Sequence, residues 1–202
     1  MYIDRMVLIL IRHAQSIYNK RNIVAGSTKD IGLTEEGKME AYDVGKLLNK
    51  YKFDYIFTSE LKRATDTCKI INGELNCNPE IIYSNKLNER NFGFLSGHEK
   101  RELENIYSIE NVRKWLITYD GIPPNGESIH DTRLRVGNYF NTHVQPLLLQ
   151  DKNVLLITHS SCLKALFVHL GLKNKTSIED FSVSNCVPIK IDIENKKYTF
   201  DK

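Results

Sequence analysis

The chain has 202 residues, 41% of them hydrophobic and 26% charged, a composition typical of a soluble globular protein that excludes collagen-like and disorder-dominated classes. Its 28 basic and 25 acidic side chains leave a formal charge of +3, too small to indicate nucleic-acid binding. The sequence contains no run of about 18 apolar residues, so it predicts no membrane span.

Short apolar runs alternate with longer amphipathic stretches along the sequence. The runs are typical of buried strands, and the stretches repeat apolar residues at steps of three and four, as a helix with one buried face does. The predicted elements in chain order are a strand over 6–11, a helix over 35–50, a strand over 54–58, a helix over 61–75, a strand over 81–83, a helix over 129–147, a strand over 153–158, a helix over 162–170 and a strand over 187–191. This alternation predicts a three-layer α/β/α fold around a mostly parallel sheet, in one domain over residues 1–202.

Each predicted helix has a candidate N-cap residue, whose side chain accepts a hydrogen bond from a free backbone N–H of the first turn. The candidates in chain order are Thr34, Ser59, Ser128, and Ser160 or Ser161. Ser128 is followed three residues later by Asp131, which is the pattern of a capping box. Before this helix, residues 121–126 are rich in glycine and proline and predict a turn.

Four cysteines lie far apart in the sequence, at Cys68, Cys77, Cys162 and Cys186. They include no Cys-x-x-Cys pair, so their spacing indicates neither a zinc site nor a disulfide framework. Reduced thiols fit a reducing compartment, and we expect a cytoplasmic protein.

Three of the predicted strands lead into residues that suit a phosphate group. The first strand is followed by Arg12 and His13, the second by a helix whose first turn carries Arg63, and the fourth by His159. Ligands of open α/β sheets bind beyond the carboxyl ends of the strands, where helix N-termini also attract anions. Parallel strands would therefore bring these four side chains into one cleft.

The four side chains have complementary chemistry towards phosphate. Two guanidinium groups can hold phosphate oxygens bidentately, and their charge disfavours imidazolium, which keeps His13 neutral and nucleophilic. His159 can stabilise the charge on the transferred group. Each feature alone has a plainer interpretation, since Arg63 is the kind of base that usually lies on the surface and His159 precedes a serine pair that can be a helix cap. Together they predict an anion-binding cleft.

The segment 10–19, Leu-Ile-Arg-His-Ala-Gln-Ser-Ile-Tyr-Asn, resembles the phosphohistidine signature of the histidine phosphatase superfamily. The resemblance is closer to the cofactor-dependent phosphoglycerate mutase branch, and to its compact members, which lack a longer insertion after Trp115. The further segments that carry it are 32–37, 58–64, 86–93, 123–128 and 154–159.

The resemblance implies a phosphoglycerate mutase-like fold and a role for each matching residue. His13 would be the phosphorylated nucleophile, with Arg12, Arg63 and His159 completing the phosphate pocket. Glu89 would be the general acid and base for the substrate oxygen, which fits carboxylate chemistry. The implied substrate contacts are Asn19, Arg90, Lys100 and Ser160, and no metal is implied.

Departures from the family pattern bear on the reaction. Mutases of this branch usually carry two arginines where this chain has Leu116 and Ile117. A charged contact is worth about 1.5–3 kcal/mol, so losing two weakens retention of a bisphosphate intermediate by about 10²-fold or more. The nearby bases that can replace the pair are Arg113, Lys114, Arg133 and Arg135.

The sequence therefore favours a phosphatase that hydrolyses phosphate monoesters through a phosphohistidine, acting on a small phosphorylated metabolite or a phosphoprotein. The alternative is a phosphoglycerate mutase that uses 2,3-bisphosphoglycerate as its primer. A third interpretation is a catalytically weak scaffold that binds phosphorylated ligands. Relatives often form dimers or tetramers, so the expected partners include a second copy of the chain, but neither nucleic acid nor membrane.

Overall fold

The computed structural model of the protein describes residues 6–201. Within this part, one sheet holds strands in the order β3-β2-β4-β1-β5-β6. Their bounds are β1 Leu8–Arg12, β2 Tyr55–Thr58, β3 Glu80–Tyr83, β4 Val154–Thr158, β5 Ile189–Asp192 and β6 Lys197–Phe200. Strands β1 to β4 pair in parallel, and β5 and β6 join one edge antiparallel. The predicted mostly parallel sheet is confirmed.

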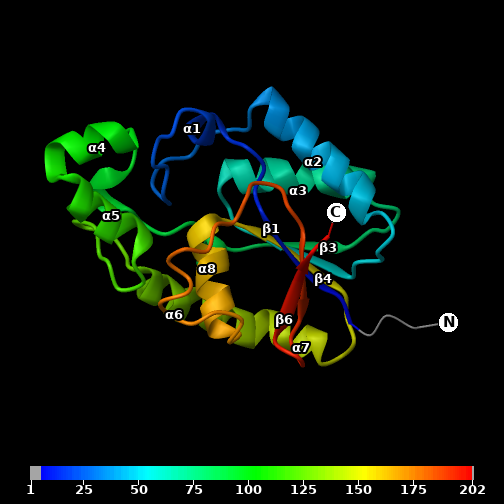
Figure 1. The fold of residues 1–202 in the computed structure, drawn as a ribbon. Coiled ribbons are helices and arrows are strands. Elements are labelled where there is room, and N and C mark those ends of the chain that lie inside the picture. Colours follow the sequence, from blue (N-terminus) through cyan, green and yellow to red (C-terminus); the bar gives the residue numbers. More distant parts are fainter. Residues whose placement is uncertain (1–5, 202) are drawn as a thin grey trace.

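Helices cover both faces of this sheet. Figure 1 shows α2 and α3 on one side and α6 to α8 on the other, while α4 and α5 project beyond the sheet. The helices are α1 Ile17–Lys20, α2 Glu35–Leu48, α3 Lys62–Glu74, α4 Lys100–Tyr107, α5 Ile109–Ile117, α6 Ile129–Tyr139, α7 Gln145–Leu148 and α8 Ser160–His169. Two 3₁₀ turns, Asn85–Leu87 and Gly93–Leu95, separate β3 from α4.

Alternate side chains of each central strand pack into two separate hydrophobic cores, one on each face of the sheet. Leu10 of β1 packs with α6 and α8 residues such as Val136, whereas its neighbour Ile11 packs with α2 and α3 residues such as Ala41 and Ile71. Successive side chains of a strand point to opposite faces, so strands that are apolar at every position need a helix layer on each side. The three-layer α/β/α arrangement is thereby confirmed.

Two of the predicted helix caps are wrong. The N-cap of α3 is Leu61, because the Ser59 hydroxyl is engaged with His159. The N-cap of α8 is His159, and Ser160 is already the first helical residue. The predicted caps Thr34 and Ser128 are confirmed, the latter with its capping box.

The predicted helix over 129–147 is divided. It runs as α6 to Tyr139, continues as a π-helical turn over Phe140–Val144, and resumes as α7 with Pro146 in its first turn. Proline lacks a backbone N–H, so the regular hydrogen-bond ladder breaks before it. The elements predicted from the sequence also do not include α1, α4, α5 and β6.

Two helical glycines provide a paired test of the packing around the loop that follows β1. A Cβ on Gly37 would lie 2.1 Å from the carbonyl oxygen of Gln15, whereas a Cβ on Gly73 would meet nothing within 4 Å. We expect Gly37→Ala to lower the free energy of unfolding by about 1–3 kcal/mol, because α2 must move off the loop. Gly73→Ala should raise it by about 0.5–1 kcal/mol through helix propensity. Urea unfolding of both variants checks this, and shifts of the same sign would contradict it.

Candidate active site

The carboxyl ends of β1, β2 and β4 lie side by side at one edge of the sheet. Arg12 pairs with Thr158 across β1 and β4, and Thr58 pairs with Ile157 across β2 and β4. The backbone N–H of His13 donates to the Thr158 carbonyl at 2.8 Å, which extends the ladder by one residue. The residues that follow these strands therefore meet, as the sequence predicted.

A cleft of about 490 Å³ opens at this edge. Seven of the nine candidate residues line it: Arg12, His13, Asn19, Arg63, Glu89, Lys100 and Ser160. His159 lies directly behind, with its ring centroid 5.1 Å from that of His13 and no exposed surface. Arg90 is fully buried, and it does not line the cleft. Its role as a substrate contact stays a prediction.

The His13 imidazole is held in one tautomer. Its Nδ1 lies 2.8 Å from the Ala14 carbonyl oxygen, which can only accept, so the ring proton resides on Nδ1. The lone pair of Nε2 is then free. Burial, reinforced by the positive charges of Arg63 and Arg12, lowers the pKa of His13 well below its ordinary value. The ring is neutral at pH 7, as a nucleophilic imidazole must be.

The second imidazole, His159, is bound by a serine. Its Nε2 lies 2.7 Å from Ser59 Oγ, and the same oxygen accepts the Leu61 N–H at 3.3 Å. Its buried Nδ1 has no hydrogen-bond partner within residues 6–201. Burial, followed by the charge of Arg63, lowers the pKa of His159 well below its ordinary value. When the Ser59 hydroxyl donates to Nε2, Nδ1 carries a proton that an anion can accept.

The two arginines of the cleft are held by backbone carbonyls. Arg12 Nη1 donates to Val183 O at 2.8 Å, and its buried Nε has no partner in the described part of the chain. Arg63 is 1% exposed, and it donates to the carbonyls of Gly26 at 2.8 Å and Lys29 at 3.2 Å. Carbonyls fix the guanidinium planes without cancelling their charge, so the charge can still attract an anion.

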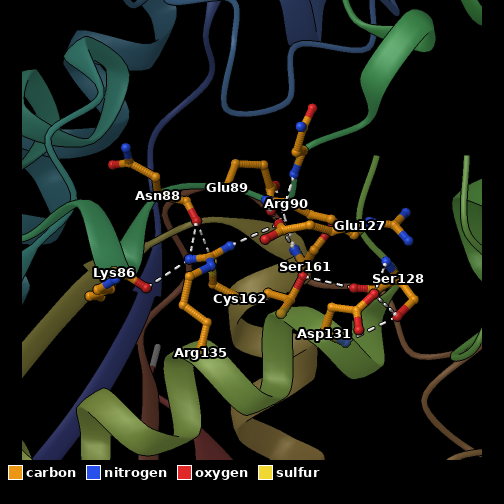
Figure 2. A network of polar contacts seen from close by, with 12 residues as sticks. Lys86, Asn88, Glu89, Arg90, Glu127, Ser128, Asp131, Arg135, Ser161 and Cys162 are labelled. Carbon is orange, nitrogen blue, oxygen red and sulfur yellow. Dashed lines mark hydrogen bonds and ion pairs between the residues drawn. The ribbon is translucent and has the colours of Figure 1, made fainter. Parts of the chain in front are cut away.

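Glu89 is the acidic residue that was predicted to move the proton. It is 8% exposed and its Oε1 accepts the backbone N–H groups of Arg90 at 2.9 Å and Ser161 at 3.1 Å. Ser161 belongs to the first turn of α8, where free N–H groups stabilise negative charge. Figure 2 shows the Glu89 carboxylate beside Arg90 and Ser161. The carboxylate thus has a fixed position in the cleft wall.

The remaining candidates have specific surroundings. Asn19 Oδ1 accepts from the Ser16 N–H in the capping box of α1 and from Asn185 Nδ2 at 3.2 Å. Lys100 is the exposed first residue of α4, and Ser160 begins α8. Their roles towards substrate stay predictions.

None of the four bases suggested as replacements for the missing arginine pair lines the cleft. Lys164 lines it instead, and its Nζ donates to Glu179 O at 3.5 Å. Burial lowers the pKa of this lysine. The sequence analysis did not predict Lys164 as a cleft residue. Its position four residues after Ser160, which places both on one face of α8, could have indicated it. Asn185 also lines the cleft but lies in an irregular loop, where no sequence pattern marks it.

In residues 6–201, no three or more histidine, cysteine or acidic side chains gather where they could hold a metal ion. The helices of the same part include none with the length and apolar content needed to cross a membrane.

Two neutral imidazoles and two buried guanidinium groups, held mainly by backbone carbonyls at the carboxyl edge of a parallel sheet, define an enzyme that transfers phosphoryl groups. The chain belongs to the histidine phosphatase superfamily (branch 1), whose family model matches residues 8–202. The expected family and the three-layer fold are both confirmed.

Named relatives fall into two kinds. The chain is 40% identical over 185 residues to a 2,3-bisphosphoglycerate-dependent phosphoglycerate mutase of Bartonella henselae. The matched region covers 90% of this chain and 89% of that protein. It is 27% identical to the alpha-ribazole phosphatase of Shigella flexneri, with a TM-score of 0.80 and coverage of 96% and 94%. It is 26% identical to a phosphoserine phosphatase of Entamoeba histolytica in complex with 3-phosphoglyceric acid, with a TM-score of 0.79 and coverage of 98% and 95%.

The lowered pKa values of His13 and His159 predict a pH-dependent stability. Below about pH 6.5 the unfolded chain binds protons on both residues, whereas the folded protein does not. Their contribution is therefore full above about pH 6.5 and is lost as the pH falls below it. The free energy of unfolding should therefore fall as the pH is lowered from about 7.5 to 5.5.

Urea unfolding in phosphate-free buffer across this range measures the effect. The double variant His13→Gln/His159→Gln should lose most of the pH dependence, while His98→Gln, at a side chain 46% exposed, should keep it. An unchanged slope in the double variant would show that other groups cause the loss of stability.

Proposed function

We propose that this protein hydrolyses phosphate monoesters through a phosphohistidine intermediate at His13. The observation that carries the proposal is the neutral, buried imidazole of His13, which shares one cleft with Arg12, Arg63 and the fixed carboxyl group of Glu89. This set supplies a nucleophile, a clamp for the phosphoryl oxygens and a proton donor.

In the first step, the lone pair of His13 Nε2 forms a bond to phosphorus. The P–O ester bond breaks, its electron pair stays on the leaving oxygen, and that oxygen takes a proton from the carboxyl group of Glu89. Arg12, Arg63 and the Nδ1–H of His159 donate to the three equatorial oxygens, where negative charge is spread. The alcohol then leaves the cleft.

In the second step, the Glu89 carboxylate takes a proton from water, and the water oxygen attacks phosphorus. The N–P bond breaks and its electron pair returns to Nε2, which releases inorganic phosphate and restores neutral His13. Because Glu89 gains the proton that it lost in the first step, the cycle closes without any further group.

The identity of the acceptor depends on the rest of the cleft. Leu116 lines it where the family resemblance places the first of two arginines, and no side chain at this position offers a charge to a second acidic group. Since each missing charged contact is worth about 1.5–3 kcal/mol, the loss of two weakens retention of a bisphosphate by about 10²-fold or more. We therefore propose water as the main acceptor and a small phosphorylated metabolite as the substrate. The free cysteine thiols favour the cytoplasm as its location.

A second candidate is a phosphoglycerate mutase that is primed by 2,3-bisphosphoglycerate. Two ammonium groups, those of Lys100 and Lys164, line the cleft and offer charge to a second acidic group. The relative from Bartonella henselae, which is 40% identical, carries the name of this activity. These observations favour the mutase, and the absence of the arginine pair counts against it.

Parallel assays decide between the two. Phosphate release and isomerisation are measured on 3-phosphoglycerate with and without 2,3-bisphosphoglycerate, beside phosphate release from sugar phosphates and phosphopeptides. We expect hydrolysis of at least one ester to exceed isomerisation. Isomerase turnover above all hydrolysis would establish the mutase instead.

The phosphohistidine itself is tested by trapping. Brief reaction with a radiolabelled ester should give a protein label that is stable in base and labile in acid, and His13→Ala should abolish both label and turnover. Retained phosphate-ester binding with no turnover in the unaltered protein would favour the scaffold interpretation.

Loss of one guanidinium should slow phosphoryl transfer sharply. Arg63→Ala should lower kcat/KM for phosphate release by about 10²-fold or more, because a preorganised charged donor is lost from the transition state. Arg113→Ala, at an exposed position outside the cleft, should stay near the unaltered value. Steady-state kinetics on one ester measures both, and an unchanged Arg63→Ala would exclude Arg63 from the phosphate pocket.

A further inference from the structure

Glu89 lies in a segment that no helix or strand supports. Residues 88–92 are irregular and connect the 3₁₀ turns Asn85–Leu87 and Gly93–Leu95. Backbone groups of such a segment need partners from outside it, and those partners decide where its side chains lie. A proton donor must stay within about 3 Å of the oxygen that it serves, so the anchoring of this segment bears on catalysis.

Arg135 on α6 anchors the segment on the N-terminal side of Glu89. Its Nη1 donates to the carbonyl oxygens of Lys86 at 2.7 Å and Asn88 at 3.0 Å. Its Nη2 lies 3.1 Å from Glu127 Oε2. Figure 2 shows the guanidinium group of Arg135 aimed at this segment from α6 below it.

Glu127 anchors the C-terminal side of the same segment. Its Oε2, already paired with Arg135, accepts the Asn91 N–H at 3.0 Å, and its own N–H donates to Asn91 O at 2.7 Å. Arg135 and Glu127 therefore hold the backbone on both sides of Glu89. Neither residue lines the cleft, and their side chains are 20% and 30% exposed.

We propose that Arg135 and Glu127 are positioning residues that hold the Glu89 carboxyl group where it meets the leaving oxygen. The inference rests on the proposed function, in which Glu89 is the acid and base. A planar guanidinium group serves two carbonyls and a carboxylate at once, which a single ammonium group cannot reproduce. A displacement of about 1 Å at a catalytic group costs about 10²-fold in rate.

The readout is the dependence of rate on the leaving group. 3-Phosphoglycerate releases an alkoxide that needs a proton, whereas 2,4-dinitrophenyl phosphate releases a stable phenolate that does not. Because Glu89 also serves as the base of the second step, which both esters share, the readout is kcat/KM, which reports the first step alone. For Arg135→Met we expect kcat/KM on 3-phosphoglycerate to fall by about 10²-fold and kcat/KM on the aryl ester by less than about 3-fold. Arg135→Lys should not restore the alkyl ester rate.

Three further variants complete the design. Glu89→Gln should give the same leaving-group pattern, and the double variant Glu89→Gln/Arg135→Met should be no slower than Glu89→Gln, because Arg135 acts through Glu89. Arg133→Met is the matched control, since Arg133 lies on the same helix and donates to Tyr119 Oη at 2.7 Å without touching the segment. If Arg135→Met does not fold, Glu127→Ala removes the carboxylate that accepts the Asn91 N–H and pairs with Arg135, and it should show the pattern.

The outcomes separate the two proposals. Equal losses of kcat/KM on both esters in Arg135→Met and Glu127→Ala, or additive losses in the double variant, would overturn the positioning role while Glu89→Gln keeps its pattern. If Glu89→Gln itself lowers kcat/KM equally on both esters, Glu89 is not the acid, and the proposed function fails at that step.

Discussion

The burial of positive charge at the carboxyl edge of the sheet is the constraint on which the site depends. A buried cation costs several kcal/mol unless hydrogen bonds replace its water. Here the replacements for Arg12 and Arg63 are mainly backbone carbonyls, those of Val183, Gly26 and Lys29. Carbonyls satisfy the N–H groups but leave the positive potential in place, apart from Asp30 at 3.7 Å from Arg63. This potential disfavours imidazolium, and in the proposed function it also attracts the phosphoryl group, so a single arrangement supplies both substrate affinity and a neutral nucleophile.

The loop that carries His13 is held in place mainly through hydrogen bonds to its backbone groups. The N–H of His13 continues the β1–β4 ladder, and the next N–H, of Ala14, donates to Thr67 Oγ1 of α3 at 3.0 Å. One residue further, the carbonyl of Gln15 receives the Thr34 N–H at 3.0 Å, where α2 begins. The loop after β1 is thus held between both helices of one layer, which fixes the imidazole orientation before any substrate binds.

Sequence patterns predicted the parts of the fold that bury a continuous apolar face. Strands β1, β2 and β4 and helices α2, α3 and α8 were found because their periodicity reports core packing directly. Helices α4 and α5 were missed because they pack on a small separate cluster around Leu103 and Val112. Within the site, residues that directly follow strands were predicted, since parallel pairing brings such ends together. The hydrogen bond from Ser59 to His159 was missed because a serine before a helix reads locally as a cap, and a contact across 100 residues overrides that preference.

Hydrolysis and transfer to a second hydroxyl use the same phosphate pocket. The residues of the cleft wall that faces the rest of the substrate therefore decide which of the two reactions occurs. That wall carries Lys100 and Lys164, but it also carries Glu179 and Asp180. The exposed ammonium group of Lys100 is screened by solvent, and Lys164 is already bonded to the Glu179 carbonyl. The two carboxylates repel a second phosphate dianion, and the two ammonium groups attract it less than a pair of arginines in a fixed fork would. In the proposed function, the cleft therefore holds one phosphoryl group firmly and a bisphosphate loosely, so that the phosphohistidine reacts with water.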